Sequence, residues 1–322
     1  MMSSERFPAL DGLRAASILL VLSGHLLPLG PKSLDLNATA GLMGMALFFS
    51  LSGFLIVRFL ADGMPLPQFA LRRLARIVPL AWTAMLILWL ASGGSLAANL
   101  LFYANLPPAK LLAGGAHLWS LCVEVQFYAV IGLLCLMHRR ALLTVPLLCL
   151  LVTGFRIFSG EPVSIVTWHR VDEVLAGGFI ALVYCGWLGR RPETLLRRIP
   201  VPIAVGVLFI CSYAGPLLYL RPYAGALVLG TAIYNLDRMS SRILINRPAR
   251  YVAEVSYALY VVHGMLMPTW LGTGHGFAKY IKRPLFFAAT FGLAHLSTFY
   301  LERPITRLVP NWRARENAPS LV

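Results

Sequence analysis

Arg14 and His25 have the side chains for anion binding and for proton transfer, and both fall in the first apolar segment of the chain. Their separation of eleven residues is close to three whole helical turns. A helix through this segment therefore places both side chains on one face, about 16 Å apart along its axis. One end of that face offers a guanidinium for anionic oxygens, and the other offers an imidazole for proton transfer. The alternative is a snorkelling arginine and a histidine whose hydrogen bonds are structural.

Glu124, His263 and His295 are further ionisable residues within apolar segments. Such residues are costly inside a membrane and usually face an aqueous cavity or a partner. Helical rise places Glu124 about 9–10 Å below the outer surface, and His263 comes out in the same outer half as His25. Ser120 lies one helical turn before Glu124, so the two are neighbours on one face. We expect His25, Glu124 and His263 to form one cluster, which is either catalytic or a structural polar knot between helices.

Three arginines, Arg72, Arg73 and Arg76, gather before Pro79 in the loop that leads into the third apolar segment. Arginine forks match phosphate oxygens bidentately, so these residues are suited to clamp a phosphorylated co-substrate. The same arginines are equally explained by the excess of positive charge that cytoplasmic loops carry.

Arg170 and Asp172, together with Glu173, open the sixth apolar segment. They lie at the outer end of that segment in the orientation derived below. We expect them to bind sugar hydroxyls, and the alternative is that they only solvate the end of a helix.

The elements that must position these residues are membrane-spanning helices. Of the 322 residues, 58% are hydrophobic and 13% are charged, and the mean hydropathy is +0.72. A soluble domain is typically about 45–50% apolar and about 25% charged, and a core of this size cannot bury the excess. We therefore predict an all-α, polytopic membrane protein with about ten transmembrane helices of about 20 residues each. The predicted spans are 11–29, 41–61, 77–93, 118–137, 140–156, 171–187, 199–215, 218–236, 251–270 and 284–302.

The distribution of lysine and arginine orients these spans, because cytoplasmic loops carry an excess of both. With a cytoplasmic N-terminus and ten alternating spans, 20 of the 28 basic residues fall on the cytoplasmic side and 8 on the outer side. Both termini are then cytoplasmic. The first segment lacks a small-residue cleavage pattern, so we interpret it as a retained helix. Residues 1–310 are predicted to form one transmembrane domain, and 311–322 a short cytoplasmic tail.

The net charge of +15 and the five cysteines have simple explanations in this setting. In a soluble protein this charge would suggest nucleic acid. Here it lies in short loops and follows from topology, so no nucleic-acid partner is expected. The cysteines fall inside apolar spans and show no metal-ligand spacing, which predicts small buried side chains and no metal site.

A series of short motifs extends over nearly the whole chain, beginning with Arg14 and, after ten intervening residues, His25. The motifs are FPALDGLRA at 7–15, GH at 24–25, FFSLSGFLI at 48–56, RRLARIVP at 72–79, LWSLCVEVQFY at 118–128, RVD at 170–172, SYALYVVH at 256–263 and ERP at 302–304. In this combination and order, the chain resembles the acyltransferase 3 family of membrane-bound O-acyltransferases that act on glycans.

The resemblance implies a ten-helix bundle in a bacterial cytoplasmic (inner) membrane. Such a protein moves acyl groups, often acetyl from cytoplasmic acetyl-CoA, to hydroxyls of glycans at the outer face. Acyl-CoA is then a co-substrate, the partners are a carbohydrate acceptor and membrane lipid, and no permanently bound cofactor is expected. Many relatives add a soluble C-terminal esterase-like domain. The sequence ends about twenty residues after the last predicted span, so we expect that domain to be absent.

The mechanistic hypothesis puts the phosphates of coenzyme A on the cytoplasmic side, against Arg14, Arg72, Arg73 and Arg76. His25 takes the proton from the acceptor hydroxyl as that hydroxyl attacks the thioester carbonyl. Glu124 orients His25 or stabilises its imidazolium form.

The remaining candidates contact the reacting oxygens or the sugar. The oxyanion donor is predicted to be Ser120, Tyr128 or His263. The substrate-binding residues are predicted to be Arg170, Asp172 and Tyr128. A covalent acyl-histidine or acyl-serine intermediate is an alternative route.

A second class of function also fits ionisable residues inside a membrane. A carrier or flippase of a lipid-linked sugar would need the same charged residues but would perform no acyl transfer. A structural membrane subunit is the third alternative. The acceptor glycan, the acyl group and the oligomeric state stay open.

Overall fold

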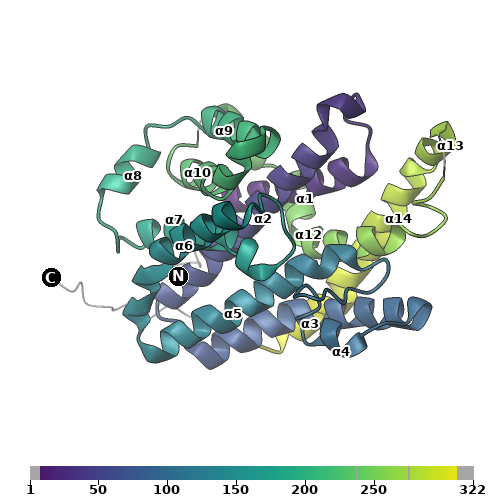
Figure 1. Ribbon diagram of the computed structural model, residues 1–322, viewed down its shortest axis with the longest axis horizontal. Coiled ribbons are helices and arrows are strands. Elements are labelled where there is room, and N and C mark those ends of the chain that lie inside the picture. Colours follow the sequence, from purple (N-terminus) through teal and green to yellow (C-terminus); the bar gives the residue numbers. More distant parts are fainter. Residues whose placement is uncertain (1–7, 237, 275, 310–322) are drawn as a thin grey trace.

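The computed structural model describes residues 8–236, 238–274 and 276–309. The predicted cytoplasmic tail, 311–322, lies outside the described residues. Within those ranges the chain is helical, with no strand. The helices are α1 (Pro8–Leu26), α2 (Leu36–Ala61), α3 (Leu66–Ser92), α4 (Leu96–Leu100), α5 (Trp119–Met137), α6 (Val145–Ser159), α7 (Asp172–Tyr184), α8 (Arg191–Leu196), α9 (Val201–Tyr213), α10 (Arg221–Tyr234), α11 (Arg238–Leu244), α12 (Arg247–Leu266), α13 (Gly276–Ile281), α14 (Arg283–Leu296) and α15 (Arg303–Arg307). The predicted all-α class is confirmed (Figure 1).

Seven helical segments in the described part of the chain are long and apolar enough to cross a membrane. They are Pro8–Leu26, Leu36–Ala61, Leu66–Ser92, Ala116–Met137, Arg139–Ser159, Gly215–Tyr234 and Phe277–Arg307. The other three predicted spans fall on α7, α9 and α12. The helices α7 and α9 have 13 residues each, and α12 begins with charged residues. The membrane class is therefore confirmed, whereas the count of about ten stays a prediction.

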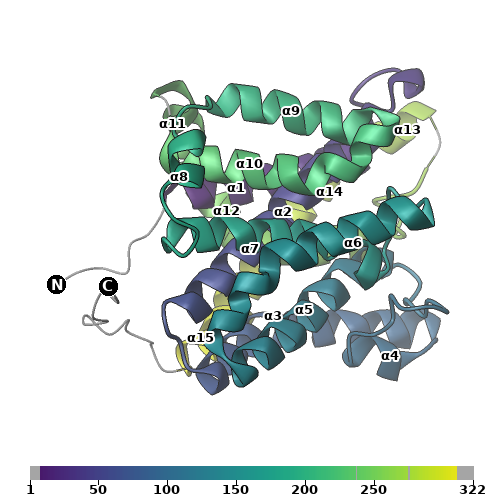
Figure 2. The same ribbon diagram turned by 60° about the vertical axis from the view of Figure 1, so that its left-hand side comes forward.

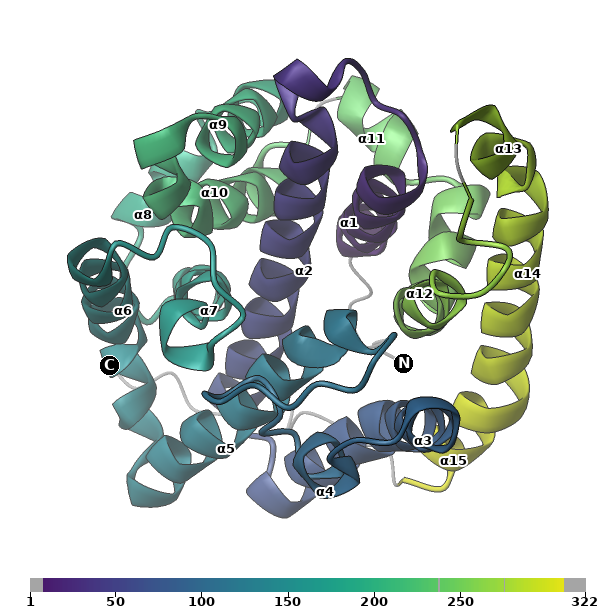
Figure 3. The same cartoon turned by 45° about the vertical axis from the view of Figure 1, so that its right-hand side comes forward.

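The helices α2 and α7 form the centre of the bundle. Every residue of α7 except Phe179 and Tyr184 is buried, and the helix packs against α2, α6 and α10. Figure 3 shows α1, α7 and α12 close to end-on, with α2 passing between α1 and α7. A helix that is buried on all sides positions its polar residues inside the protein, away from lipid.

Two glycines allow the close crossing of α2 and α7. A Cβ atom added at Gly53 would lie 1.8 Å from the carbonyl oxygen of Val174, and one added at Gly177 would lie 1.9 Å from that of Ser50. Small residues at a helix crossing let two backbones approach closely, which is how helices pack tightly where lipid removes the hydrophobic driving force.

The outer helices present apolar side chains to the surroundings of the bundle. Leu90 of α3, Leu136 of α5 and Phe158 of α6 are 71%, 71% and 89% exposed. Further exposed leucines and isoleucines lie on α9 and α14, and α9 covers α10 on one side of the bundle (Figure 2). An apolar exterior around a polar interior suits a lipid environment.

Helix α3 begins at Leu66, eleven residues before the predicted start of the span at 77. The prediction of a loop at Arg72, Arg73 and Arg76 is wrong, because these residues lie in the first turns of this helix. Buried Phe69 anchors those turns, and Pro79 sits inside the helix without ending it. Membrane helices tolerate proline where neighbouring groups satisfy the freed backbone.

Candidate functional site

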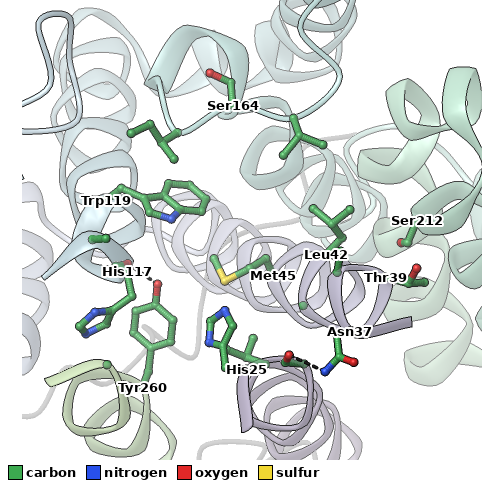
Figure 4. A pocket seen from close by; sticks show the side chains of 18 of the residues that line it. His25, Asn37, Thr39, Leu42, Met45, His117, Trp119, Ser164, Ser212 and Tyr260 are labelled. Carbon is green, nitrogen blue, oxygen red and sulfur yellow. Dashed lines mark hydrogen bonds between the residues drawn. The ribbon is translucent and has the colours of Figure 1, made fainter. Parts of the chain in front are cut away.

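A cavity of about 950 Å³ lies at one end of the bundle (Figure 4). Its wall is built from the end of α1, the start of α2, the start of α5 and the end of α12, and loop residues close the rim. His25, Trp119 and Tyr260 project from three of these elements toward the same space. His117, in the turn before α5, also lines the cavity, and its Nε2 lies 3.0 Å from the carbonyl oxygen of Val261 on α12. A largely apolar cavity with a few convergent polar groups is the usual form of a small-molecule site.

His25 and His263 form a hydrogen-bonded pair in this wall. Nδ1 of His25 lies 3.1 Å from Nε2 of His263. Nδ1 of His263 lies 3.2 Å from the carbonyl oxygen of Leu259, which can only accept, so that nitrogen carries a proton. Nε2 of a neutral His263 then accepts, and His25 donates from Nδ1. This arrangement leaves Nε2 of His25 with a free lone pair, on a ring that is exposed to the cavity.

Tyr260 and Ser120 support the histidine pair from inside the wall. Ser120 Oγ donates to the Tyr260 hydroxyl at 2.8 Å, and that hydroxyl donates to the carbonyl of His117. The Tyr260 ring packs against the rings of His263 and His117, with centroids 5.6 Å and 5.5 Å apart. The hydroxyl of Ser120 is fully buried and is used within this network, so it does not face the cavity.

Asn37, at the start of α2, braces the backbone on both sides of His25. Its Nδ2 donates to the carbonyl of Gly24 at 2.8 Å and to that of Leu27 at 2.6 Å. Its Oδ1 accepts from the N–H of Leu29 at 3.4 Å. The end of a helix leaves carbonyls without helical partners. Asn37 donates to two of these carbonyls, next to His25, and so fixes the backbone that positions the His25 side chain.

We predict that Asn37→Asp lowers kcat about tenfold or more while the protein still folds, because the carboxylate keeps the shape of the amide but loses both donors. The measurement is kcat and KM for acyl transfer, together with the elution profile in detergent. Asn246→Asp is the matched control, since Asn246 caps the exposed start of α12, where aspartate is an equally good cap. Equal activity of the two variants would contradict a positioning role for Asn37.

Glu124 does not contact His25. Its Oε1 accepts from Ser52 Oγ at 2.7 Å and from the Tyr128 hydroxyl at 2.5 Å. The guanidinium of Arg73 lies over the Tyr128 ring, 5.9 Å from its centroid. Glu124 and Tyr128 therefore belong to the arginine cluster, and the residue that contacts His25 is His263.

Three of the four arginines that the sequence assigned to coenzyme A, Arg14, Arg73 and Arg76, lie near one another at the start of α1 and the first turns of α3. The charges of Arg73 and Arg76 act on Arg14, as does that of Glu124, and Arg72 interacts with the charge of Arg73. Asp11 pairs with Arg14 at 3.8 Å. Three carboxylates, those of Asp11, Glu124 and Glu302, act on these guanidinium groups. Four arginines against three carboxylates leave an excess of positive charge, which suits a polyphosphate.

A narrow space of about 10 Å³ lies between these two groups of residues. Val21, Met45 and Tyr260 line both this space and the large cavity. Ser17, on its other side, donates to the carbonyl of Arg14 at 2.8 Å. The arginine cluster, the narrow space and the histidine cavity thus follow one another along α1.

The predicted sugar-binding residues do not all lie at the cavity. Tyr128 is apart from the other two and contacts Glu124 in the arginine cluster. Arg170 lines the cavity, whereas Asp172 is fully buried, pairs with Arg156 and accepts from Thr153 Oγ1 at 3.0 Å. Arg156 and Arg221 are among the eight basic residues counted on the outer side, and the structure buries both of them fully inside the protein. In a sequence, a charged residue at the end of an apolar segment looks the same whether it faces water or pairs with a buried charge of opposite sign.

Sequence reasoning missed His117, Tyr260 and Asn37 as site residues. Tyr260 lies inside the motif at 256–263, and His117 directly precedes the motif at 118–128. Their polar side chains in apolar surroundings could have identified them as site residues. Asn37 had no such signal, because a polar residue that precedes an apolar run reads as an ordinary helix start.

The fold and the site define a multi-pass α-helical membrane protein with a histidine-walled cavity at one end and an arginine cluster toward the other. Residues 7–303 match the model of the acyltransferase 3 family, described as an acyltransferase domain, and the chain belongs to this family. The resemblance inferred from its motifs is confirmed.

Several curated proteins are similar to this chain. Peptidoglycan O-acetyltransferase OatA of Listeria monocytogenes is 24% identical over 95% of this chain and 56% of its own length. YrhL of Bacillus subtilis is 25% identical over 92% and 54%, and O-acetyltransferase OatA of Staphylococcus aureus is 23% identical over 82% and 51%. The chain spans about half the length of these relatives. No solved structure matches it.

Proposed function

We propose that this protein transfers an acyl group, most simply acetyl, from cytoplasmic acyl-CoA to a hydroxyl of a cell-surface or lipid-linked carbohydrate. The observation that carries the proposal is the His25–His263 pair, whose hydrogen bonds leave Nε2 of His25 free on the cavity side. Two of the relatives carry names that say peptidoglycan O-acetyltransferase. These names support acetyl as the transferred group and a carbohydrate as the acceptor.

In this mechanism His25 Nε2 takes the proton of the acceptor hydroxyl as the oxygen attacks the thioester carbonyl. His25 becomes an imidazolium whose Nδ1–H is held by His263 Nε2, at the 3.1 Å separation of the neutral pair. His263 thus has the orienting role that a carboxylate has in other acyl-transfer sites. The C–S bond breaks, the thiolate of coenzyme A takes the proton from His25 Nε2, and the acyl ester remains on the sugar with His25 neutral again.

The acyl-CoA donor is proposed to bind at the arginine cluster formed by Arg14, Arg72, Arg73 and Arg76. Its pantetheine arm would follow α1 past Ser17 and bring the thioester to His25. The space beside Ser17, about 10 Å³, holds about one water molecule, so the helices have to part there for the arm to pass. The rise of about 16 Å along α1 from Arg14 to His25 is within reach of a long extended arm. Binding energy from the remote phosphates is then used to hold the thioester at the reacting centre.

The acceptor is proposed to enter the cavity from outside a bacterial cytoplasmic membrane, with both termini in the cytoplasm. The charge distribution supports this orientation, because the loops at the rim of the cavity belong to the side with 8 of the 28 basic residues. The arginine cluster lies on the side with 20.

Arg73→Gln is expected to raise KM for acetyl-CoA by about tenfold, with a smaller change in kcat, because the guanidinium would contact phosphate and not the reacting atoms. Steady-state thiol release by the purified variant measures both constants. Arg197→Gln is the control, since Arg197 is an exposed arginine that pairs with Glu193 elsewhere on the protein. A fall in kcat alone, with KM unchanged, would rule out Arg73 as part of the donor site.

Release of free thiol from acetyl-CoA by the purified protein, with and without a glycan acceptor, tests the proposed function itself. We expect thiol release that rises with acceptor concentration and matches the ester formed. A flippase or carrier of a lipid-linked sugar would move its substrate between leaflets and release no thiol, and that result would overturn the proposal.

A further inference from the structure

Five charged side chains form a buried group beside the cavity. Three are the arginines Arg156, Arg170 and Arg221, and two are the carboxylates Asp172 and Glu173; none is more than 1% exposed. Three positive charges against two negative ones leave one positive charge in excess. A buried charge without a full complement of partners is costly, so such a surplus calls for an anion.

The contacts of the group leave two nitrogens unsatisfied on each of two arginines: Nη1 and Nη2 of Arg221, and Nε and Nη1 of Arg170. Arg156 pairs with Asp172 and also donates to the carbonyl of Pro162 at 2.7 Å. Arg221 Nε donates to Glu173 Oε1 at 2.7 Å. Arg170 is left with a 3.4 Å approach of its Nε to Glu173 Oε2, and its Nε and Nη1 have no hydrogen-bond partner.

Arg170 is also the arginine of this group that lines the cavity. Its guanidinium lies over the Trp119 ring, 5.2 Å from the centroid, and Trp119 lines the same cavity (Figure 4). Packing on an aromatic face fixes the plane of the fork. The carboxylate that lines this cavity, Asp35, is exposed and belongs to the loop before α2.

We infer that the acceptor carries an anionic group, a carboxylate or a phosphate, which binds Arg170 while the accepting hydroxyl reaches His25 across the same cavity. This inference rests on the proposed acyl-transfer function and names its substrate class. The planar fork of Arg170 presents its N–H groups to two oxygens of one carboxylate or phosphate at once. Arg156 and Arg221 pair with Asp172 and Glu173 and do not line the cavity, so they do not contact the acceptor.

The test compares acyl transfer to acceptors of equal length that differ only in charge. The panel contains a neutral hexose oligosaccharide, the same oligosaccharide with one hexuronic acid, and the same oligosaccharide with one phosphate group on its reducing end. The wild-type protein is expected to prefer at least one anionic acceptor by about tenfold or more in kcat/KM. The hexuronate and the phosphate arms tell the two sources of the anion apart. No preference for either would overturn the inference.

Arg170→Gln is expected to bring that preference down to roughly equal use of charged and neutral acceptors, because the glutamine cannot form the charge-assisted pair. Lys110→Gln, which removes an exposed cation from an outer loop, should keep the wild-type preference. An unchanged preference in Arg170→Gln, or a loss of preference in Lys110→Gln, would contradict the assignment.

A second measurement needs no variant and covers the case in which Arg170→Gln does not fold. Free glucuronate should inhibit transfer by the wild-type protein at a concentration at least about tenfold lower than glucose does. Equal inhibition by the two sugars would overturn the inference. Failure of the proposed function itself looks different, because acetyl-CoA would then release no thiol with any acceptor.

Discussion

His25→Ala is expected to lower kcat/KM for acyl transfer by about 10²–10⁴-fold, the usual contribution of a positioned general base. The alanine removes Nε2 of His25. In the pair with His263, this nitrogen keeps a free lone pair that faces the cavity. Protein yield and elution in detergent should stay close to wild type, because His25 is exposed to the cavity and its other contacts are with a single partner. Ester formation on the acceptor and thiol release are the two readouts.

His295→Ala is the control for this variant. His295 lies on α14, where its ring contacts Tyr251 and Phe299 and does not line the cavity. We expect near wild-type transfer from it. Wild-type rates in a folded His25→Ala protein would exclude His25 as the base, and so would an equal loss of activity in His295→Ala.

Gly177→Ala is expected to destabilise the protein by about 1–3 kcal/mol or more, the range for overpacking a close contact. The added methyl would lie 1.9 Å from the carbonyl oxygen of Ser50, which is backbone and cannot rotate away. Since α2 and α7 are the central pair of the bundle, any shift there moves the elements that carry the cavity. Thermal unfolding of the purified protein in detergent measures the loss.

Gly154→Ala provides the matched control, because this glycine lies within α6 and an added Cβ meets nothing within 4 Å. Alanine is the better helix former by about 1 kcal/mol, so this variant should be as stable as wild type or slightly more stable. If both alanine variants unfolded at the same temperature, the crossing would not depend on Gly177.

The all-α membrane class and the shared helix face of Arg14 and His25 could be predicted from the sequence. Arg14 and His25 were predicted to share a face of the first helix, and both lie on α1, toward the arginine cluster and the cavity respectively. The prediction depended only on helical periodicity, which is a local property. The family followed from ordered motifs and is confirmed by the match over residues 7–303.

Contacts between helices were beyond such reasoning. Glu124 was expected beside His25 because helical rise gave the two residues similar depth. That estimate assumes upright helices, and α5 lies obliquely to α1, α7 and α12, which are seen end-on in Figure 3. The tilt carries Glu124 toward Ser52 and the arginine cluster. The pairing of His25 with His263 joins residues 238 positions apart, and no local pattern specifies it.

The buried charged group illustrates a second limit. Arg156, Arg170 and Arg221 stand at the ends of apolar segments, where the positive-inside rule interprets arginine as loop charge. The structure turns all three inward onto Asp172 and Glu173. Only the three-dimensional arrangement shows that Arg170 keeps unpartnered N–H groups beside the cavity.

The central claim is that one chain joins a cytoplasmic donor site to an acceptor site on the other face of the membrane. The protein, inserted in one orientation into sealed vesicles, is given labelled acetyl-CoA on the side of the arginine cluster and glycan acceptor on the side of the cavity. We predict labelled glycan on the cavity side, formed by wild-type protein and not by His25→Ala. Labelled glycan formed only when donor and acceptor are on the same side would contradict the account.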